Sequence, residues 1–335
     1  MRNNIIKVGV IGLGVGEAHI KSYKNIKNVE VLAICDFDTK RLEEIKKKYK
    51  IPYAYTDSKR ITENKEINLV SICSYDNFHY AQLISSFRNG KHVMVEKPIV
   101  LYKHQAEKVL KVWKESKCKI TSNLILRQSP RFRKLKREIR KGFYGKIYHI
   151  EGDYIHYILQ KITKGWRGKM PFYSTVYGGG IHLIDLMRWL IQEEVKEVSS
   201  FGNNILTQNT QYKFPETICA LLKFESGATG KSLSTYGPKR TKFHSLNVYG
   251  SKRTFINSTS KAEIFLGDNQ KDKILDKTAY PGFEKGDLLP EFISSILENK
   301  NPEISGEDIF RVMDICFAIW ESYKKRKTIK ISYLL

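Results

Sequence analysis

Three adjacent residues offer the clearest chemistry in this chain. Glu96, Lys97 and Pro98 close an apolar run at residues 92–95, and doubly wound α/β sheets bind their ligands at the carboxyl ends of such buried strands. A lysine ammonium can hydrogen-bond a substrate hydroxyl or exchange a proton with it, and partial burial brings a lysine pKa toward working pH. Pro98 restricts Lys97 to extended backbone and permits a cis bond, which would direct the side chain. A surface lysine before a turn proline remains the plain alternative for these three residues alone.

A glycine-rich turn follows the apolar residues 5–11 and comprises Gly12, Leu13, Gly14, Val15 and Gly16. Gly12 permits a tight turn, and Gly14 lets the backbone approach a pyrophosphate that the next helix stabilises with its N-terminus. The spacing is G-x-G-x-G, one residue short of the usual G-x-G-x-x-G, so Glu17 stands where a third glycine is expected. The turn predicts a dinucleotide site, and a merely structural turn is the alternative.

Asp36 gives the turn its specificity. It ends the second predicted strand about 20 residues after the turn, as the dinucleotide fingerprint requires. A carboxylate there accepts hydrogen bonds from the ribose 2′-hydroxyl of adenosine and repels a 2′-phosphate. We therefore expect NAD as the cofactor, although Arg41 nearby leaves NADP open.

Composition limits the class of protein. The 335 residues are 41% apolar, which suffices for two substantial cores, and no run approaches the ~18 apolar residues of a membrane span. The N-terminus has no signal-peptide layout. The five cysteines are scattered without a C-x-x-C pair, which predicts reduced thiols in a cytoplasmic protein without a metal site.

The net charge of +23 (58 basic minus 35 acidic residues) is spread through nearly every segment. One dense cluster, residues 127–141, has the pattern of an amphipathic helix with Phe132, Leu135 and Ile139 on its apolar face. We interpret the basic residues of this cluster as a solvated face rather than a polyanion site. No DNA-reading helix or stacking motif is recognisable, which argues against nucleic-acid binding.

The predicted elements divide the chain near residue 123. Before it, short apolar strands alternate with helices, which indicates a doubly wound parallel sheet, a Rossmann domain at residues 1–122. The predicted strands are 5–11, 30–35, 67–73, 91–95 and 119–122, and the helices are 17–25, 39–49, 78–89 and 103–116.

Residues 123–335 predict a second α/β domain with an open, largely antiparallel sheet. Its strands are expected at 146–158, 195–206, 217–224, 229–236, 244–249, 253–257 and 262–266, and its helices at 181–191 and 309–324. One face of this sheet should stay free of helices. A face of that kind invites another subunit, so we expect a homodimer or homotetramer.

Four stretches together resemble the Gfo/Idh/MocA oxidoreductases, the glucose–fructose oxidoreductase and inositol dehydrogenase family: residues 8–19, 71–79, 90–98 and 178–185. The resemblance implies a Rossmann domain followed by a substrate domain with an open sheet. It places a loop along the nicotinamide side of the cleft, through Ser74, Tyr75, Asn77 and His79, with Tyr75 in place of the family's usual proline. It also places Glu96 and Lys97 against the nicotinamide ribose and the substrate.

The implied reaction is hydride transfer between nicotinamide and a secondary alcohol of a sugar, polyol or nucleotide sugar. Lys97 would polarise the hydroxyl, His182 would accept its proton, and Asp185, at i+3, could orient the imidazole. Arg127 and Tyr154 are candidate substrate contacts, and Trp166 with Arg167 could cover the cleft. Ordinary core or surface roles remain open for these four residues.

Gly178 departs from the family pattern, because many relatives carry a carboxylate or amide four residues before this histidine. The proton relay could then run through Tyr154, His156 or Tyr177, or catalysis could be altered or lost. Two functions stay open. The first is an NAD-dependent dehydrogenase, for which surface-glycan biosynthesis is one context, and the second is a non-catalytic dinucleotide-binding regulator on the same scaffold.

Overall fold

The computed structural model describes residues 5–269 and 271–335. Its internal packing divides the chain into two units. The first comprises the chain up to Asn123 with Glu284–Phe310 and Leu335, and the second comprises Leu124–Phe283 and Arg311–Leu334. The first stretch of the first unit ends at Asn123, and the later segment Glu284–Phe310 packs with this unit rather than with the residues that precede it in the chain.

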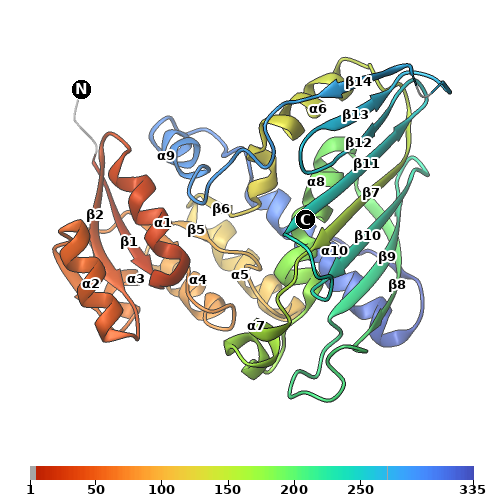
Figure 1. The fold of residues 1–335 in the computed structure, drawn as a ribbon. Coiled ribbons are helices and arrows are strands. Elements are labelled where there is room, and N and C mark those ends of the chain that lie inside the picture. Colours follow the sequence, from red (N-terminus) through yellow and green to blue (C-terminus); the bar gives the residue numbers. More distant parts are fainter. Residues whose placement is uncertain (1–4, 270) are drawn as a thin grey trace. The chain divides into compact units, whose positions relative to one another are not determined.

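The first unit is built on a six-stranded sheet in the order β3-β2-β1-β4-β5-β6, with every neighbouring pair parallel (Figure 1). This is the strand order of a Rossmann fold, which confirms the predicted fold class. Its strands are β1 (Ile6–Ile11), β2 (Val29–Cys35), β3 (Tyr53–Tyr55), β4 (Leu69–Ile72), β5 (His92–Val95) and β6 (Ile120–Ser122). Its helices are α1 (Leu13–Lys24), α2 (Thr39–Tyr49), α3 (Lys59–Thr62), α4 (His79–Arg88), α5 (Lys103–Ser116) and α9 (Leu289–Leu297).

Apolar runs explain this sheet. Strands β1, β4 and β5 are buried along almost their whole length, as strands covered on both faces must be. Sequence patterns missed the short β3 and α3, which have too few residues to show a period. Helix α1 begins at Leu13 rather than at the predicted residue 17, so most of the glycine turn is its first turn.

The late segment joins the first unit through helix α9. Leu289, Phe292 and Ile293 on α9 belong to the same buried core as Ile20 and Tyr23 on α1. Hydrogen bonds add to this packing, since Ser22 Oγ donates to the Gly286 carbonyl at 2.9 Å and Thr121 Oγ1 donates to that of Ile304 at 3.0 Å. No short-range pattern reveals such a return of the chain to an earlier domain.

The second unit contains a nine-stranded sheet in the order β14-β13-β12-β11-β7-β10-β9-β8-β15 (Figure 1). Among the strand pairs that the described residues form in this sheet, only β10–β7 is parallel, so the prediction of a largely antiparallel sheet is confirmed. The strands are β7 (Ile147–Ile155), β8 (Val195–Asn203), β9 (Thr217–Phe224), β10 (Thr229–Thr235), β11 (Phe243–Gly250), β12 (Thr254–Ile256), β13 (Ala262–Phe265), β14 (Lys273–Asp276) and β15 (Ile329–Lys330). The sequence did not predict β14 and β15.

The helical elements of this unit are η1 (Ile125–Gln128), α6 (Pro130–Arg140), α7 (Leu159–Thr163), η2 (Trp166–Lys169), the π-helical turn η3 (Val176–Gly180) and α8 (Ile181–Ile191). Helix α10 (Gly306–Lys325) begins in the first unit and continues into the second. Helix α8 packs on β7 at Gly152, where an added Cβ would lie 3.1 Å from Leu183 Cβ. The opposite face of the sheet leaves Phe201 and Leu221 exposed, at 76% and 60%.

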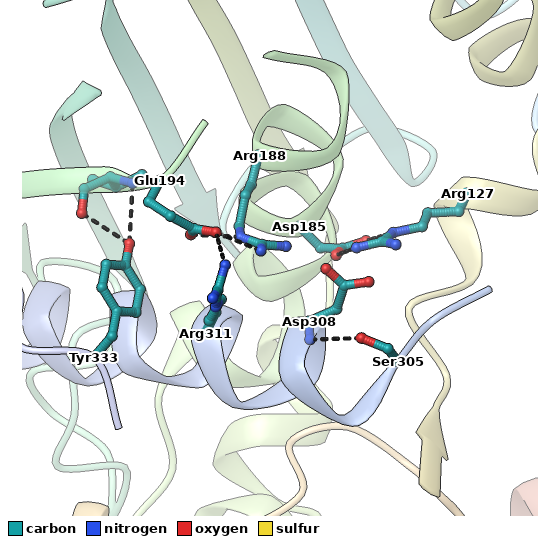
Figure 2. Close-up of polar contacts among 9 residues, drawn as sticks. Arg127, Asp185, Arg188, Glu194, Ser305, Asp308, Arg311 and Tyr333 are labelled. Atoms are coloured by element: carbon teal, nitrogen blue, oxygen red, sulfur yellow. Dashed lines mark hydrogen bonds and ion pairs between the residues drawn. The ribbon is translucent and has the colours of Figure 1, made fainter. Parts of the chain in front are cut away.

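A charged joint ties α8, β8 and α10 together within the second unit (Figure 2). Glu194 accepts two hydrogen bonds from Arg188, at 2.7 and 2.6 Å, and one from Arg311 at 2.7 Å. Tyr333 Oη donates to the Val195 carbonyl beside it, at 2.8 Å. These contacts fix the start of β8 against both helices.

The basic cluster at residues 127–141 is only partly the solvated face that its sequence predicts. Arg131 is 1% exposed, and its guanidinium donates to the carbonyls of Ser258, Ser260 and Thr278 at 2.7–3.0 Å. Lys136 is buried as well, with its ammonium on the carbonyl of Trp189 at the end of α8. Lys136 supplies a donor to the end of α8, where the last helix carbonyls have no intrahelical partner, and Arg131 supplies donors to buried loop carbonyls, which need partners as well.

Within the two described stretches, no helix combines the length and the apolar character needed to cross a membrane.

Candidate active site

The carboxyl ends of β1 and β4 meet at the centre of the parallel sheet, where ligands of this fold bind. Gly12 ends β1 with a positive φ of 88°, a conformation that only glycine adopts readily. A Cβ on Gly12 would also lie 2.5 Å from the backbone carbonyl of Cys73. Both constraints require glycine here and explain why Gly12 permits the tight turn that the sequence predicts.

The other two glycines of the turn differ from each other. An added Cβ on Gly14 would meet no protein atom within 4 Å, so the backbone is open to a ligand there. A Cβ on Gly16 would lie 2.9 Å from Val10 Cγ1, so Gly16 allows α1 to pack closely on β1. Glu17, in the slot expected for a third glycine, instead holds Arg41 and Lys48 of α2 at 2.5 and 2.8 Å.

Asp36 lies beside the turn, at the end of β2. Its Oδ2 accepts a hydrogen bond from the Leu13 amide at 2.6 Å, and its Oδ1 accepts one from the Asp38 amide at 3.0 Å. Arg41 is paired with Glu17 and lies 3.6 Å from Glu44. This pairing neutralises the one cation that left NADP open, and the site therefore fits NAD.

The loop after β4 is braced from within. Ser74 Oγ donates to Gln82 Oε1 at 2.7 Å. The buried ring of His79 faces two carbonyl oxygens, that of Pro98 at 2.8 Å and that of Ser74 at 3.1 Å. His79 thereby links the loop to the Glu96–Pro98 segment. Tyr75 packs its ring on Phe37, with centroids 5.6 Å apart, and Asn77 is exposed.

Glu96 and Lys97 follow β5, one strand further along the same edge, and the Lys97–Pro98 peptide is cis. Only 13% of the Glu96 side chain is exposed. Its Oε1 accepts from Asn123 Nδ2 at 2.7 Å and lies 3.4 Å from His19 Nε2. Burial by itself raises the pKa of Glu96, but His19, Lys97 and Asn123 together outweigh it and lower the pKa to about 2.

Sequence reasoning missed His19 as a member of this site. The residue stands just after the glycine turn, on the buried side of α1, with no exposed surface. The sequence did contain a signal, since His19 falls on the apolar face of a predicted helix. A buried polar side chain needs a hydrogen-bond partner, so a histidine at that position predicts a polar group nearby.

His182 belongs to the second unit, where it lies in the first turn of α8 directly after the π-helical turn η3. It is 5% exposed, and its ring lies near that of Tyr154, with centroids 6.2 Å apart and planes at 25°. Tyr154 Oη is 3.2 Å from His156 Nδ1. Burial raises the pKa of Tyr154, so the phenol remains a donor at neutral pH.

Arg127 and Asp185 contact each other (Figure 2). Arg127 Nε donates to Asp185 Oδ2 at 2.9 Å, and Nη2 donates to Oδ1 at 2.5 Å. The side chains are 2% and 0% exposed. Arg127 was predicted to contact substrate and Asp185 to orient the His182 imidazole, and in the structure this bidentate pair joins η1 to α8.

The position of Gly178 has no room for a side chain. An added Cβ would lie 2.3 Å from Tyr173 Oη and 2.5 Å from Tyr236 Oη. These buried hydroxyls are 3.3 Å apart, and Arg167 Nε donates to Tyr173 Oη at 3.0 Å. The sequence named Tyr154, His156 and Tyr177 as substitutes for a missing carboxylate but did not find Tyr173 and Tyr236. Tyr177 packs its ring on Phe172 and Phe317.

The structure thus gathers most of the predicted site residues in two groups. The turn, Asp36, the loop after β4 and Glu96–Lys97 share one edge of the first unit. The pair Arg127–Asp185 and the neighbours His182 and Tyr154 lie in the second. The convergence of Lys97 with His182 remains a prediction.

Known proteins resemble this chain along its length. Residues 6–124 match the model of an oxidoreductase family with an NAD-binding Rossmann fold, and residues 132–256 match the Gfo/Idh/MocA C-terminal domain. The myo-inositol 2-dehydrogenase of Thermotoga maritima is 27% identical over 98% of this chain and 100% of its own length.

Two solved structures share the fold. The scyllo-inositol dehydrogenase of Lactobacillus casei with NAD(H) and scyllo-inositol has a TM-score of 0.81 at 21% identity, covering 97% of this chain and 98% of that one. Levoglucosan dehydrogenase in complex with NADH has a TM-score of 0.88 at 18% identity, covering 98% and 99%. With both domain models matched in order, this chain belongs to the Gfo/Idh/MocA oxidoreductase family.

Proposed function

We propose that this protein is an NAD-dependent dehydrogenase that oxidises a secondary alcohol of a polyol or sugar to a ketone. One observation carries the proposal: the glycine turn, Asp36 and Glu96–Lys97 follow strands β1, β2 and β5, whose carboxyl ends share one edge of the parallel sheet. The open backbone at Gly14 suits a pyrophosphate, and the Asp36 carboxylate suits a ribose diol. The named activities of the inositol and levoglucosan dehydrogenases support the substrate class.

Each residue then has a task. Bound NAD supplies the hydride acceptor. Lys97 donates a hydrogen bond to the substrate hydroxyl, which orients the carbinol and stabilises negative charge on its oxygen. His182 accepts the hydroxyl proton while the hydride leaves the same carbon, so one alcohol yields one ketone, one proton and one reduced cofactor. This division of labour requires the ends of β5 and α8 to face each other in the working enzyme.

The test is turnover with purified protein and NAD. Inositol isomers, free sugars, sugar phosphates and UDP-sugars are offered in turn, and growth of the reduced-nicotinamide absorbance band is followed. We expect the absorbance to increase with a cyclic polyol or a free sugar. An increase with UDP-sugars alone would identify the substrate as a nucleotide sugar and support a role in surface-glycan assembly. Tight NAD binding without turnover on any compound would instead favour a dinucleotide-binding regulator.

We also propose that a second copy of the chain covers the free face of the nine-stranded sheet. Phe201, Cys219 and Leu233 lie side by side across β8, β9 and β10, and they form an apolar row on that face. Next to the row, Lys231 contacts Asp153 at 2.9 Å and Glu151 at 3.9 Å. A face with apolar residues and both signs of charge can pair with itself across a twofold axis.

Analytical ultracentrifugation tests this assembly. The wild type should sediment as a dimer or tetramer, and Phe201→Lys combined with Leu221→Lys should give monomers of unchanged secondary structure. A monomeric wild type at micromolar concentration contradicts the proposal. A cytoplasmic location is a separate part of the proposal. All five cysteines are free thiols, which suits a reducing compartment.

A further inference from the structure

A buried polar network lies beneath the cofactor edge of the first unit and centres on His19. This imidazole has no exposed surface. Its Nδ1 lies 2.8 Å from Ser71 Oγ and 3.4 Å from Cys73 Sγ, and its Nε2 lies 3.4 Å from Glu96 Oε1. One side chain on α1 therefore contacts groups at the ends of both β4 and β5.

The surroundings of the ring favour its charged form. Burial opposes a charge on His19, but the interactions with Cys73 and Glu96 outweigh burial and raise the pKa of His19 to about 10. The other titratable groups facing the network are Tyr23, whose hydroxyl donates to Ser71 Oγ at 3.4 Å, and Lys97, which acts on Glu96. A nearly buried carboxylate next to a buried cation is stable only as a pair, because removal of one partner leaves an uncompensated charge.

The network holds Glu96 at a single oxygen. Both Asn123 Nδ2 and His19 Nε2 approach Oε1, so these two contacts leave the acceptor capacity of Oε2 for a ligand. An ionised carboxylate accepts hydrogen bonds at both oxygens, whereas a protonated carboxyl carries a donor O–H on one of them and is the weaker acceptor. The histidine beneath the site and the reactive edge above it are therefore coupled through one side chain.

We propose that His19 is a positioning residue that acts through Glu96: the imidazolium keeps this carboxylate ionised and oriented, so that Oε2 accepts a hydrogen bond from a ribose hydroxyl in the nicotinamide half of NAD. The inference rests on the proposed function, because it takes NAD as the ligand of this edge. It adds a residue that touches neither the cofactor nor the substrate.

The experiment measures NAD affinity against pH by calorimetry, which needs no substrate. His19→Gln keeps a hydrogen-bond donor but removes the charge, so the pKa of Glu96 should rise into the accessible range. We expect the variant to lose about tenfold more NAD affinity than the wild type between pH 8 and pH 5.5. Adding Glu96→Gln to this variant should abolish the extra acid loss and leave affinity uniformly weak. His104→Gln, an exposed histidine of the same unit, is the matched control and should follow the wild-type curve.

The outcomes separate the possible failures. A His19→Gln curve parallel to the wild-type curve means that His19 only fills space, and the inference is then wrong. A wild-type protein that does not bind NAD at any pH contradicts the proposed function instead.

If His19→Gln does not fold, NMR titration of the histidine ring signals in the wild type and in stable variants tests the charge state of His19 instead. The His19 ring signal, identified by its shift in Ser71→Ala, should remain that of an imidazolium from pH 6 to pH 8.5 and should titrate in Glu96→Gln. A His19 signal that titrates near pH 6.5 in the wild type overturns the inference.

Discussion

The two units of this protein each bury an ion pair, and the two pairs are built differently. In the first unit, His19 and Asn123 both approach one oxygen of Glu96, at the carboxyl end of β5. In the second, both oxygens of Asp185 accept from the fork of Arg127. A carboxylate held at one oxygen can still accept from a ligand, whereas a bidentate partner occupies the geometry that a ligand would need.

This contrast separates function from stability. Polar residues at the edge of the first unit should affect cofactor and turnover, with little effect on folding. The buried pair Arg127–Asp185 in the second unit should affect folding first. Four substitutions can break or sharpen this comparison.

Lys97→Ala should have the largest effect, on turnover. Loss of the ammonium that polarises the hydroxyl should lower kcat by about a thousandfold, a typical loss for a group that moves or stabilises a proton. NAD affinity should stay within a few-fold, and the urea midpoint should not move. Lys103→Ala, an exposed lysine of the same unit, serves as the control. Unchanged turnover would remove Lys97 from the mechanism.

Arg127→Met should lower the free energy of unfolding by about 3–5 kcal/mol, because it removes the bidentate cation from the buried Asp185 carboxylate. Urea denaturation measures this loss. Adding Asp185→Leu should recover much of it by removing the buried carboxylate that has lost its bidentate cation. Arg137→Met, at an exposed position of α6, should cost almost nothing. A stable Arg127→Met protein with weakened substrate binding would reverse the comparison and return Arg127 to the substrate site.

Gly178→Ala should destabilise the second unit by about 1–3 kcal/mol, the usual cost of overpacking. The new Cβ would press on the hydroxyls of Tyr173 and Tyr236. The loss should shrink in a Tyr173→Phe background, where one hydroxyl is gone. Gly267→Ala is the control, since a Cβ there meets no atom within 4 Å. Equal thermal midpoints for wild type and Gly178→Ala would show that the tyrosines move aside easily.

Asp36→Ala should have the smallest effect, about a tenfold loss of NAD affinity, as expected for one hydrogen bond to a charged group. Discrimination against NADP should relax at the same time, because the repulsion of a 2′-phosphate is removed. Titrations with NAD and NADP in parallel measure both changes. If the preference does not move, Asp36 supports the turn through the Leu13 amide but is not the ribose ligand.

The first unit was more predictable than the second. Gly12, Asp36 and Glu96–Lys97 each follow directly on an apolar strand, and parallel strands bring their carboxyl ends to one edge. All four predicted helices and all five predicted strands of this unit exist, with shifts of a few residues at their ends. The return of α9 to this unit was not predictable, because contact between α1 and α9 depends on how the intervening residues fold.

In the second unit, the hydrophobic pattern of the sequence predicts strands but not the contacts between side chains that are distant in sequence. The alternation of buried and exposed residues predicted β7 to β13, but it could not show that Arg127 meets Asp185, 58 residues later. The departure at Gly178 was visible as a residue type. Its cause, the hydroxyls of Tyr173 and Tyr236, depends on side chains that only the folded unit brings together.

The sequence alone determined the fold class, the dinucleotide turn and the reactive tripeptide, because short spacings along the chain set backbone geometry and strand ends. Tertiary structure decided which partners the buried charged side chains have: His19 beneath Glu96, Arg127 on Asp185, and loop carbonyls around Arg131. The physical reason is that the free energy of a buried charge depends on its partners in space, and those partners are distant in sequence.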